Sequence, residues 1–319
     1  MYSNILWIFS SENPMSIPSY IVGGIMPADY LKIKKVIYLK HNNARKFLLK
    51  HKPKIIILSK ALHNGILDLA KEAKFLDIKI ISIFDDWHFE NTKDEILDRS
   101  NLNRELTKLS KIIIAKTDYA AKIIKENTKV LPKVIPDCIR YKTLSPINSF
   151  KNPINVSWFG NYTNHKTVIK AIDEILLSDH KINLQIITNK IEKIKNLLKD
   201  KKNSVSIKYF EWSLDLHKHI ENSDIVILPL FKNNKSGVKS SNRIVDSLNM
   251  GRFVIVNENE QFKEFNKFCF FGNIGLGLNW IKNNEKEAIK KIVEGQKYVI
   301  EKYHLNKICS EWEKVINNC

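Results

Sequence analysis

The sequence predicts an α/β protein made of two Rossmann-like domains that face each other across a cleft. Short apolar runs alternate with longer amphipathic segments in both halves of the chain, as expected of strand-helix-strand units around a parallel sheet. The 319 residues exceed what one hydrophobic core usually organises. Residues 136–153 contain three prolines and no clear period, which is typical of a connection between domains.

We therefore expect an N-terminal domain at 1–150, a C-terminal domain at 151–284 and a helical tail at 285–319 that packs back on the N-terminal domain. The first apolar run, Ile5 to Ser10, has no basic segment before it and no small-residue cleavage site after it, so it is predicted to be a buried strand. In the first half the predicted strands are 5–10, 35–39, 54–58, 78–84, 111–115 and 130–135, and the predicted helices include 64–75, 94–109 and 118–126.

The second half repeats this pattern. A strand at 155–159 is followed by a turn that contains Gly160 and then by a helix at 165–177. Further strands are predicted at 183–187, 205–209, 225–228 and 253–256, and the tail is predicted to form helices at 286–302 and 307–316.

Composition restricts the class of protein. No apolar run approaches the roughly 20 residues of a membrane-spanning helix, so we expect a soluble, cytoplasmic protein. The four cysteines are widely spaced and form no metal or redox motif. The net charge of +18 is compatible with nucleic-acid binding, with peripheral contact at an anionic inner membrane face, or with a lysine-rich composition. Because the basic residues are spread over many segments, we favour composition and expect no nucleic-acid partner.

The stretch from Lys239 to Val256 carries the most functional information. Polar residues precede an amphipathic helix, and Gly251 ends it before a buried strand. A helix N-terminus has unpaired N–H groups and a positive dipole end, which suit a diphosphate. Lys239 and Arg243 would add positive charge there, and Asp246 would accept hydrogen bonds from ribose hydroxyls. The alternative interpretation is an ordinary capped helix with solvated charges.

This stretch resembles the donor-binding helix of bacterial GT-B glycosyltransferases of the large group-one type. The segment Val134-Ile135-Pro136-Asp137-Cys138-Ile139 is similar to that family's crossing between domains, and Asn222 to Pro229 is similar to its Ala-Asp-Val-x-Val-Leu-Pro segment. The resemblance covers most of residues 110–260. Val238 stands where retaining members have the first of two glutamates, so the resemblance leaves the stereochemistry of transfer open.

The resemblance implies that a nucleotide-sugar donor binds to the C-terminal domain and that a glycan or lipid-linked acceptor binds to the N-terminal domain, in surface polysaccharide biosynthesis. It implies no cofactor and no metal. The expected donor-binding residues are Gly160, Asn161, Asn189, Trp212, Lys239, Ser241, Asn242, Arg243 and Asp246. Trp212 would stack on the base, although a place in the core is an equal alternative.

The second candidate group is Asp85, Asp86 and His88, directly after the strand that ends at Phe84. Paired carboxylates beside an imidazole suit the binding or deprotonation of an acceptor hydroxyl, or the binding of a divalent ion. Two aspartates and one histidine with no further ligand are weak evidence for a metal. The alternative is that the aspartates cap the next helix. Gly23-Gly24 lacks the spacing of a dinucleotide fingerprint, so it either allows close approach of a ligand or relieves packing.

Two other functions stay open from the sequence. A nucleotide-sugar epimerase on the same scaffold would need acid and base residues on both sides of the sugar and no separate acceptor. A basic protein that binds nucleic acid or an anionic surface is indicated by the net charge alone.

Overall fold

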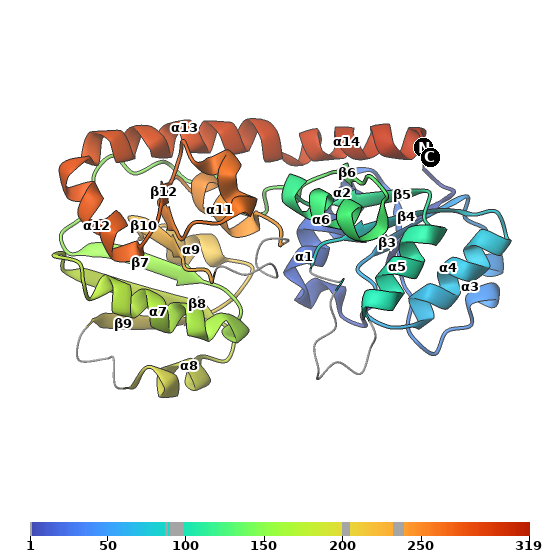
Figure 1. Ribbon diagram of the computed structural model, residues 1–319, viewed down its shortest axis with the longest axis horizontal. Helices are drawn as coiled ribbons and strands as arrows, with labels where there is room; N and C mark the ends of the chain where they lie inside the picture. The colour runs from blue at the N-terminus through green and yellow to red at the C-terminus, as the bar shows by residue number, and fades with distance from the viewer. Residues whose placement is uncertain (1, 87–88, 90–98, 200–204, 232–238) are drawn as a thin grey trace. The chain divides into compact units, whose positions relative to one another are not determined.

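A computed structural model describes residues 2–86, 89, 99–199, 205–231 and 239–319 (Figure 1). The described residues divide into two compact units. Unit 1 takes its residues from 1–138, 234–241 and 303–319, and unit 2 takes them from 139–233 and 242–302. Each unit contains one parallel sheet with helices against it, so the predicted pair of α/β domains is confirmed.

The sheet of unit 1 has six parallel strands in its described part, in the order β2-β1-β3-β4-β5-β6. Its strands are β1 (Ile5–Phe9), β2 (Lys34–Ile37), β3 (Ile55–Ser59), β4 (Lys79–Phe84), β5 (Ile112–Ala115) and β6 (Lys133–Val134). Alternate residues of β1 enter two different cores: Leu6 and Ile8 contribute to one, Trp7 and Phe9 to the other. Because both faces of the sheet are buried, the sequences of these strands are nearly continuous apolar runs rich in isoleucine.

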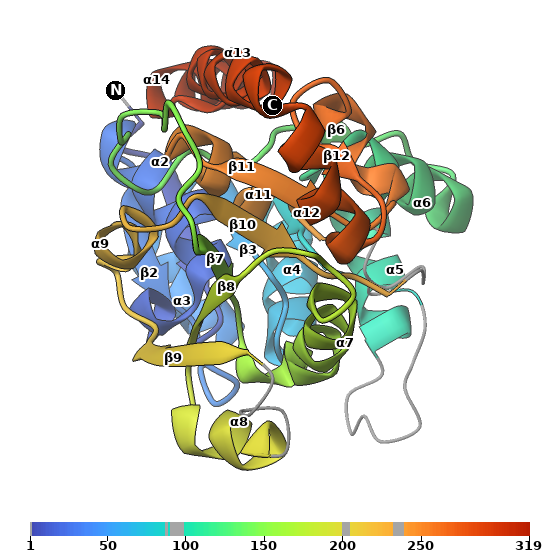
Figure 2. The same ribbon diagram turned by 90° about the vertical axis from the view of Figure 1, so that its left-hand side faces the viewer.

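Helices cover both faces of this sheet (Figures 1 and 2). They are the short helices η1 (Pro14–Ser16), α1 (Pro18–Tyr20), the π-helix η2 (Ile21–Ile25) and α2 (Met26–Tyr30), and the longer α3 (Ala44–His51), α4 (Gly65–Phe75), α5 (Arg99–Leu109), α6 (Asp118–Thr128) and α14 (Leu305–Asn317). Helix α14 joins unit 1 through Trp312, whose ring centroid lies 4.7 Å from that of Trp7.

A buried ion pair adds to the same core of unit 1. Lys116 Nζ lies 2.9 Å from Asp137 Oδ1, and both side chains are fully buried. A Cβ atom on Gly23 would lie 2.7 Å from this Asp137 oxygen, and one on Gly24 would lie 2.9 Å from Phe9. Because the protein's own atoms occupy the space beside both glycines, the structure favours the packing explanation for Gly23-Gly24.

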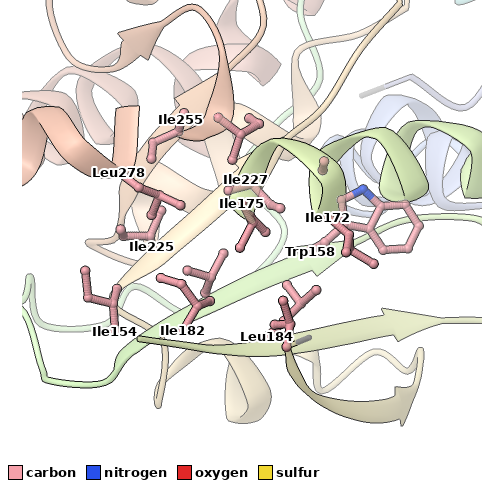
Figure 3. Close-up of a cluster of buried hydrophobic side chains, with 14 of the residues drawn as sticks. Ile154, Trp158, Ile172, Ile175, Ile182, Leu184, Ile225, Ile227, Ile255 and Leu278 are labelled. Atoms are coloured by element: carbon pink, nitrogen blue, oxygen red, sulfur yellow. The ribbon is translucent and has the colours of Figure 1, made fainter. Parts of the chain in front are cut away.

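Unit 2 contains a second parallel sheet, with the order β12-β11-β10-β7-β8-β9 over its described residues. The strands are β7 (Ile154–Phe159), β8 (Ile182–Thr188), β9 (Ser206–Glu211), β10 (Ile225–Leu228), β11 (Phe253–Val256) and β12 (Phe270–Phe271). Apolar side chains from β7, β8 and β10 pack with Ile172 and Ile175, which lie on the long helix after β7, and with Leu278 (Figure 3).

The helices of unit 2 are η3 (Tyr162–Asn164), α7 (His165–Ile175), α8 (Ile191–Leu197), α9 (Leu216–Ile220), α11 (Asn242–Asn249), η5 (Glu260–Phe265), α12 (Ile274–Asn283) and α13 (Glu285–Tyr303). Ala288 and Ile292 of α13 belong to the core of this unit. The division therefore separates the two helices expected as one tail, because α13 packs on unit 2 and α14 on unit 1.

The segment after Cys138 is fastened to unit 2. Ile147 N–H donates to the carbonyl of Gly251 at 3.2 Å, and Gln296 Nε2 donates to the carbonyl of Leu144 at 2.8 Å. Residues 139–150 accordingly fall with unit 2, although the sequence placed them in the first domain. No helix in the described ranges is both long and apolar enough to cross a membrane.

Candidate active site

In unit 2, three of the predicted donor-binding residues directly follow neighbouring strands. Gly160 follows β7, Asn189 follows β8 and Trp212 follows β9. Thr188 Oγ1 donates to the carbonyl of Gly160 at 2.7 Å, and Trp212 N–H donates to the carbonyl of Thr188 at 3.1 Å. The carboxyl ends of the three strands are thus tied together, at the edge where ligands of such sheets bind.

Two of the predicted asparagines shape the turn after β7. Asn161 Oδ1 accepts from Thr163 N–H at 3.0 Å and so caps η3. Asn189 Oδ1 accepts from Tyr162 N–H at 2.7 Å. Both amide oxygens therefore hold the loop that leads into α7.

Arg243 lies in the first turn of α11 and approaches this edge. A Cβ atom on Gly160 would lie 3.5 Å from Arg243 Nη1, an ordinary contact distance, so the guanidinium lies beside this glycine. Arg243 Nη1 is shielded from solvent and has no hydrogen-bond partner among the described residues. Burial lowers the pKa of Arg243 to about 10. A buried N–H donor without a partner is costly, so the position of this nitrogen is suited to an anionic ligand.

Helix α11 adds a second feature that suits an anion. It begins at Asn242, and its first turn contains no acidic residue. Its first N–H groups and the positive end of its dipole therefore lie on the same turn as Arg243. Residues 239–241, the polar residues predicted before the helix, precede it and are not part of it.

The other residues predicted on this stretch differ in their placement. Lys239 is exposed and Ser241 is buried, and both fall with unit 1 rather than with Arg243. Asp246 is buried one turn after Arg243. Burial raises the pKa of Tyr141, and the nearby carboxylate of Asp246 raises it further, so Asp246 faces this tyrosine.

Sequence reasoning missed a second arginine in unit 2. The guanidinium carbon of Arg140 lies 4.9 Å from the ring centroid of Tyr141 and 5.0 Å from that of Trp212. Its Nη2 atom is shielded from solvent and has no hydrogen-bond partner in the part of the chain that the structure describes. Arg140 therefore stacks against the tryptophan that was predicted to contact the base. Its separation from Trp212 along the chain left no local signal for this contact.

In unit 1, the predicted Asp85 and Asp86 follow β4, and the neighbouring strand places a lysine against them. Lys60 Nζ lies 3.6 Å from Asp85 Oδ1 and 3.5 Å from Asp86 Oδ2. Burial works against the charged form of Lys60, but the two carboxylates outweigh it and raise the pKa of the lysine. The Asp85 side chain is 6% exposed and that of Asp86 is 34% exposed, so Asp86 is the more accessible carboxylate.

The backbone of Lys60 is held in place by two hydroxyl groups. Its φ of 48° lies in the left-handed region, which costs a lysine about 1 kcal/mol or more. Ser10 Oγ donates to the carbonyl of Lys60 at 2.6 Å, and the Tyr20 hydroxyl donates to it at 3.3 Å. Lys60 directly follows a buried strand, which is the signal by which the sequence could have identified it. His88 lies outside the described residues.

Among the residues that the structure describes, no three His, Cys, Asp or Glu side chains gather as metal ligands would.

No protein-family model and no curated protein sequence matches this chain. Solved structures do match it. Anabaena Alr3699/HepE in complex with UDP and glucose has a TM-score of 0.77 at 11% identity, over 99% of each chain. The lipopolysaccharide outer core galactosyltransferase WaaB has a TM-score of 0.65 at 12% identity, over 98% of this chain and 99% of that one. S. aureus TarM has a TM-score of 0.66 at 16% identity, over 86% of this chain and 58% of that one. The chain has the GT-B fold of these structures.

Proposed function

We propose that this chain transfers a sugar from a nucleotide-sugar donor to a hydroxyl of a glycan or lipid-linked acceptor, in surface polysaccharide biosynthesis. The observation that carries the proposal is the buried, unpaired Nη1 of Arg243 in the first turn of α11, beside Gly160. A diphosphate would supply the missing charge and would accept hydrogen bonds from the guanidinium and the helix N–H groups. The complex of HepE with UDP and glucose supports this choice of ligand.

Unit 2 would bind the donor. The diphosphate would lie at Arg243 and the start of α11, the ribose at Asp246 and the base at Trp212, with Arg140 behind the indole ring. As the bond between the anomeric carbon and the diphosphate oxygen breaks, negative charge grows on the leaving group. Arg243 and the helix dipole would stabilise that charge, so we expect no metal requirement.

Unit 1 would bind the acceptor. Asp86 is the carboxylate best placed to accept a hydrogen bond from an acceptor hydroxyl, because it is the more exposed of the pair and Lys60 holds it. The acceptor oxygen then bonds to the anomeric carbon, and its proton passes either to a base on unit 1 or to the departing phosphate. Val238 leaves the choice between retention and inversion open.

The other functions considered from the sequence have less support. The solved structures with this fold that are named above include a galactosyltransferase and complexes with UDP, and no epimerase or nucleic-acid-binding protein is among them. An epimerase would release an isomerised nucleotide sugar without any acceptor, so product analysis separates the two enzymes.

The proposal is tested by titrating the protein with UDP, GDP and ADP in a calorimeter. Arg243→Ala should weaken the binding of whichever nucleotide binds most tightly by about 1.5–3 kcal/mol, the scale of a hydrogen bond to a charged group. Arg45→Ala removes the same charge from an exposed position on α3 of unit 1 and should leave the affinity unchanged. Equal affinity of the Arg243→Ala and wild-type proteins, with Arg243→Ala folded, would contradict the assignment.

The acceptor side is tested with the same proteins. Asp86→Asn and His88→Ala should lower the rate of transfer while sparing the affinity for the nucleoside diphosphate. Loss of nucleotide affinity in either variant, with normal dependence on acceptor concentration, would contradict the division of roles between the units.

A further inference from the structure

Arg140 of unit 2 has a hydrogen-bond donor for which the protein supplies no acceptor. Its Nη2 atom is shielded from solvent and has no hydrogen-bond partner among the residues that the structure describes. The guanidinium carbon lies 4.9 Å from the ring centroid of Tyr141 and 5.0 Å from that of Trp212. An aromatic ring is only a weak acceptor, so these contacts do not replace a hydrogen bond. A guanidinium carries donors alone, and the missing group must therefore be an acceptor.

The backbone on both sides of this contact is held in place. Asn249 Nδ2 donates to the carbonyl of Tyr141, the residue next to Arg140, at 2.9 Å. Across the contact, Trp212 N–H donates to the carbonyl of Thr188 at 3.1 Å. The unpaired donor is therefore presented by a fixed part of unit 2, as is usual for a group that recognises a ligand.

The Tyr141 hydroxyl connects this contact with the residue that is expected to bind the ribose. Burial is the main cause that raises the pKa of Tyr141, and the carboxylate of Asp246 raises it further. The charge of Arg140 and a hydrogen bond with the Trp212 side chain act in the opposite direction. These three side chains therefore lie around one hydroxyl group. Because the base of a nucleotide is joined directly to the ribose, this position favours a base as the missing acceptor.

The common bases differ in the group that they would offer to this donor. Uracil and guanine carry an exocyclic carbonyl oxygen where cytosine and adenine, respectively, carry an amino group. The oxygen accepts a hydrogen bond from a guanidinium, whereas the amino group is itself a donor and would leave Nη2 unpaired. Trp212 is partly exposed and could stack on any of these bases, since each has a π-face. Discrimination between the bases would therefore come from Arg140.

We propose that Arg140 selects the base of the donor nucleotide by donating from Nη2 to the exocyclic carbonyl oxygen of uracil or guanine. This inference rests on the proposed function. A base stacked on the open part of the Trp212 ring would have the shielded nitrogen of Arg140 at its inner edge. A site built to donate a hydrogen bond rejects a ligand that leaves the buried donor unpaired, so the bases with an amino group at this position bind weakly.

The test is calorimetric titration of the full chain with two matched pairs of nucleotides, UDP with CDP and GDP with ADP. The members of each pair differ chiefly in carrying a carbonyl or an amino group at the same ring position. In the pair that binds more tightly, the dissociation constant of the amino member should exceed that of the carbonyl member by about 10-fold to 100-fold. The same titrations show whether the preferred base is a pyrimidine or a purine.

Two substitutions and a control show whether Arg140 causes this preference. Arg140→Gln introduces an amide that accepts as well as donates, so the ratio of the two dissociation constants should fall close to one. Arg140→Lys keeps a group that only donates and should keep the preference for the carbonyl base. In the control, Lys195→Gln, the lysine lies 5.9 Å from the Tyr209 ring in the same unit but has an acid, Glu192, at 2.7 Å. This change should leave the ratio as it is in the wild type.

A purely structural role of Arg140 gives a different result. If Arg140 only supports the indole ring, Arg140→Gln will weaken the binding of every nucleotide by the same factor, and the proposal is overturned. Equal binding of both members of each pair by the wild-type protein also overturns it, and this comparison needs no variant. Nucleotide binding without discrimination would leave the proposed function intact, whereas failure of all these nucleotides to bind would overturn both.

Discussion

The lysines that directly follow β3 and β5 in unit 1 are paired with acids, whereas two arginines of unit 2 have no acid within ion-pair distance among the described residues. In unit 1 Lys60 faces Asp85 and Asp86, and Lys116 faces Asp137. In unit 2 Arg243 and Arg140 each have a buried nitrogen with no partner among the described residues. A neutralised edge is suited to uncharged hydroxyl groups, whereas an edge with excess positive charge is suited to an anion. The difference predicts which substitutions will affect folding and which will affect binding.

The largest effect is expected where a neutralised pair is broken. Asp137→Asn leaves Lys116 buried without its acid, and the free energy of unfolding should fall by about 3–5 kcal/mol. Denaturant unfolding measures this loss. Asp77→Asn, which removes an exposed partner of Lys79, is the control and should cause no measurable change. If the Asp137→Asn protein were as stable as the wild type, charge neutralisation would not distinguish the two units.

Two arginines of unit 2 differ in the same way within one domain. The Arg252 guanidinium donates to four carbonyl oxygens, those of Ile220, Ser145, Gly251 and Glu221. Arg252→Met should therefore lower the free energy of unfolding by about 3 kcal/mol, since buried carbonyls lose their donor. Arg243→Met removes a buried nitrogen that has no partner, so the unliganded protein should be as stable as the wild type or more stable. A large loss of stability in Arg243→Met would show that its charge is balanced by the fold.

A smaller effect is expected at Asp246, which is buried near Tyr141. If Asp246 also binds the ribose, Asp246→Asn should raise the dissociation constant of the donor about tenfold, the value of one hydrogen bond to a charged group. The turnover number at saturating donor should hardly change. A collapse of turnover with unchanged donor affinity would instead place Asp246 in the chemical step.

The smallest effect is expected at Lys60. The pKa of Lys60 is raised. Its pairing with Asp85 and Asp86 should therefore stabilise the fold fully at pH values below the ordinary lysine pKa of about 10.4, and this stabilisation should be lost only at higher pH. Lys60→Met should raise the acceptor KM a few-fold, equally at pH 6 and pH 9, and Lys60→Arg should restore it. Pure destabilisation of the fold would give no such rescue, and a changed nucleotide affinity would argue against a role on the acceptor side.

Much of the fold was predictable because the strands are buried on both faces. Runs such as Ile55–Ser59 and Ile225–Leu228 are apolar throughout, and their alternation with helices indicated a parallel sheet. Strand β12 was missed because two residues are too short to show a period. Helices α3 and α12 were given no bounds from the sequence, since α3 is a short, lysine-rich helix and α12 carries two glycines.

The candidate site was predictable only in part. Asp85, Gly160, Asn189 and Trp212 directly follow strands, which is where functional residues of such sheets are expected, and their roles stay predictions. The partners of these residues depend on strand order. Strand β3 lies beside β4, and this brings Lys60 to Asp85 across a separation in sequence that no local motif reveals. The contact of Arg140 with Trp212 has the same origin.

The place of Trp312 has a consequence for how the protein is made. Strands β1 to β6 are synthesised before residue 135, whereas the indole that packs on Trp7 belongs to α14. All of unit 2 is synthesised before that helix emerges. Residues 20–28 cover part of the same sheet face early, but the part that Trp312 covers has no partner until α14 is made, so the core of the unit that is translated first becomes complete only after unit 2 has been synthesised.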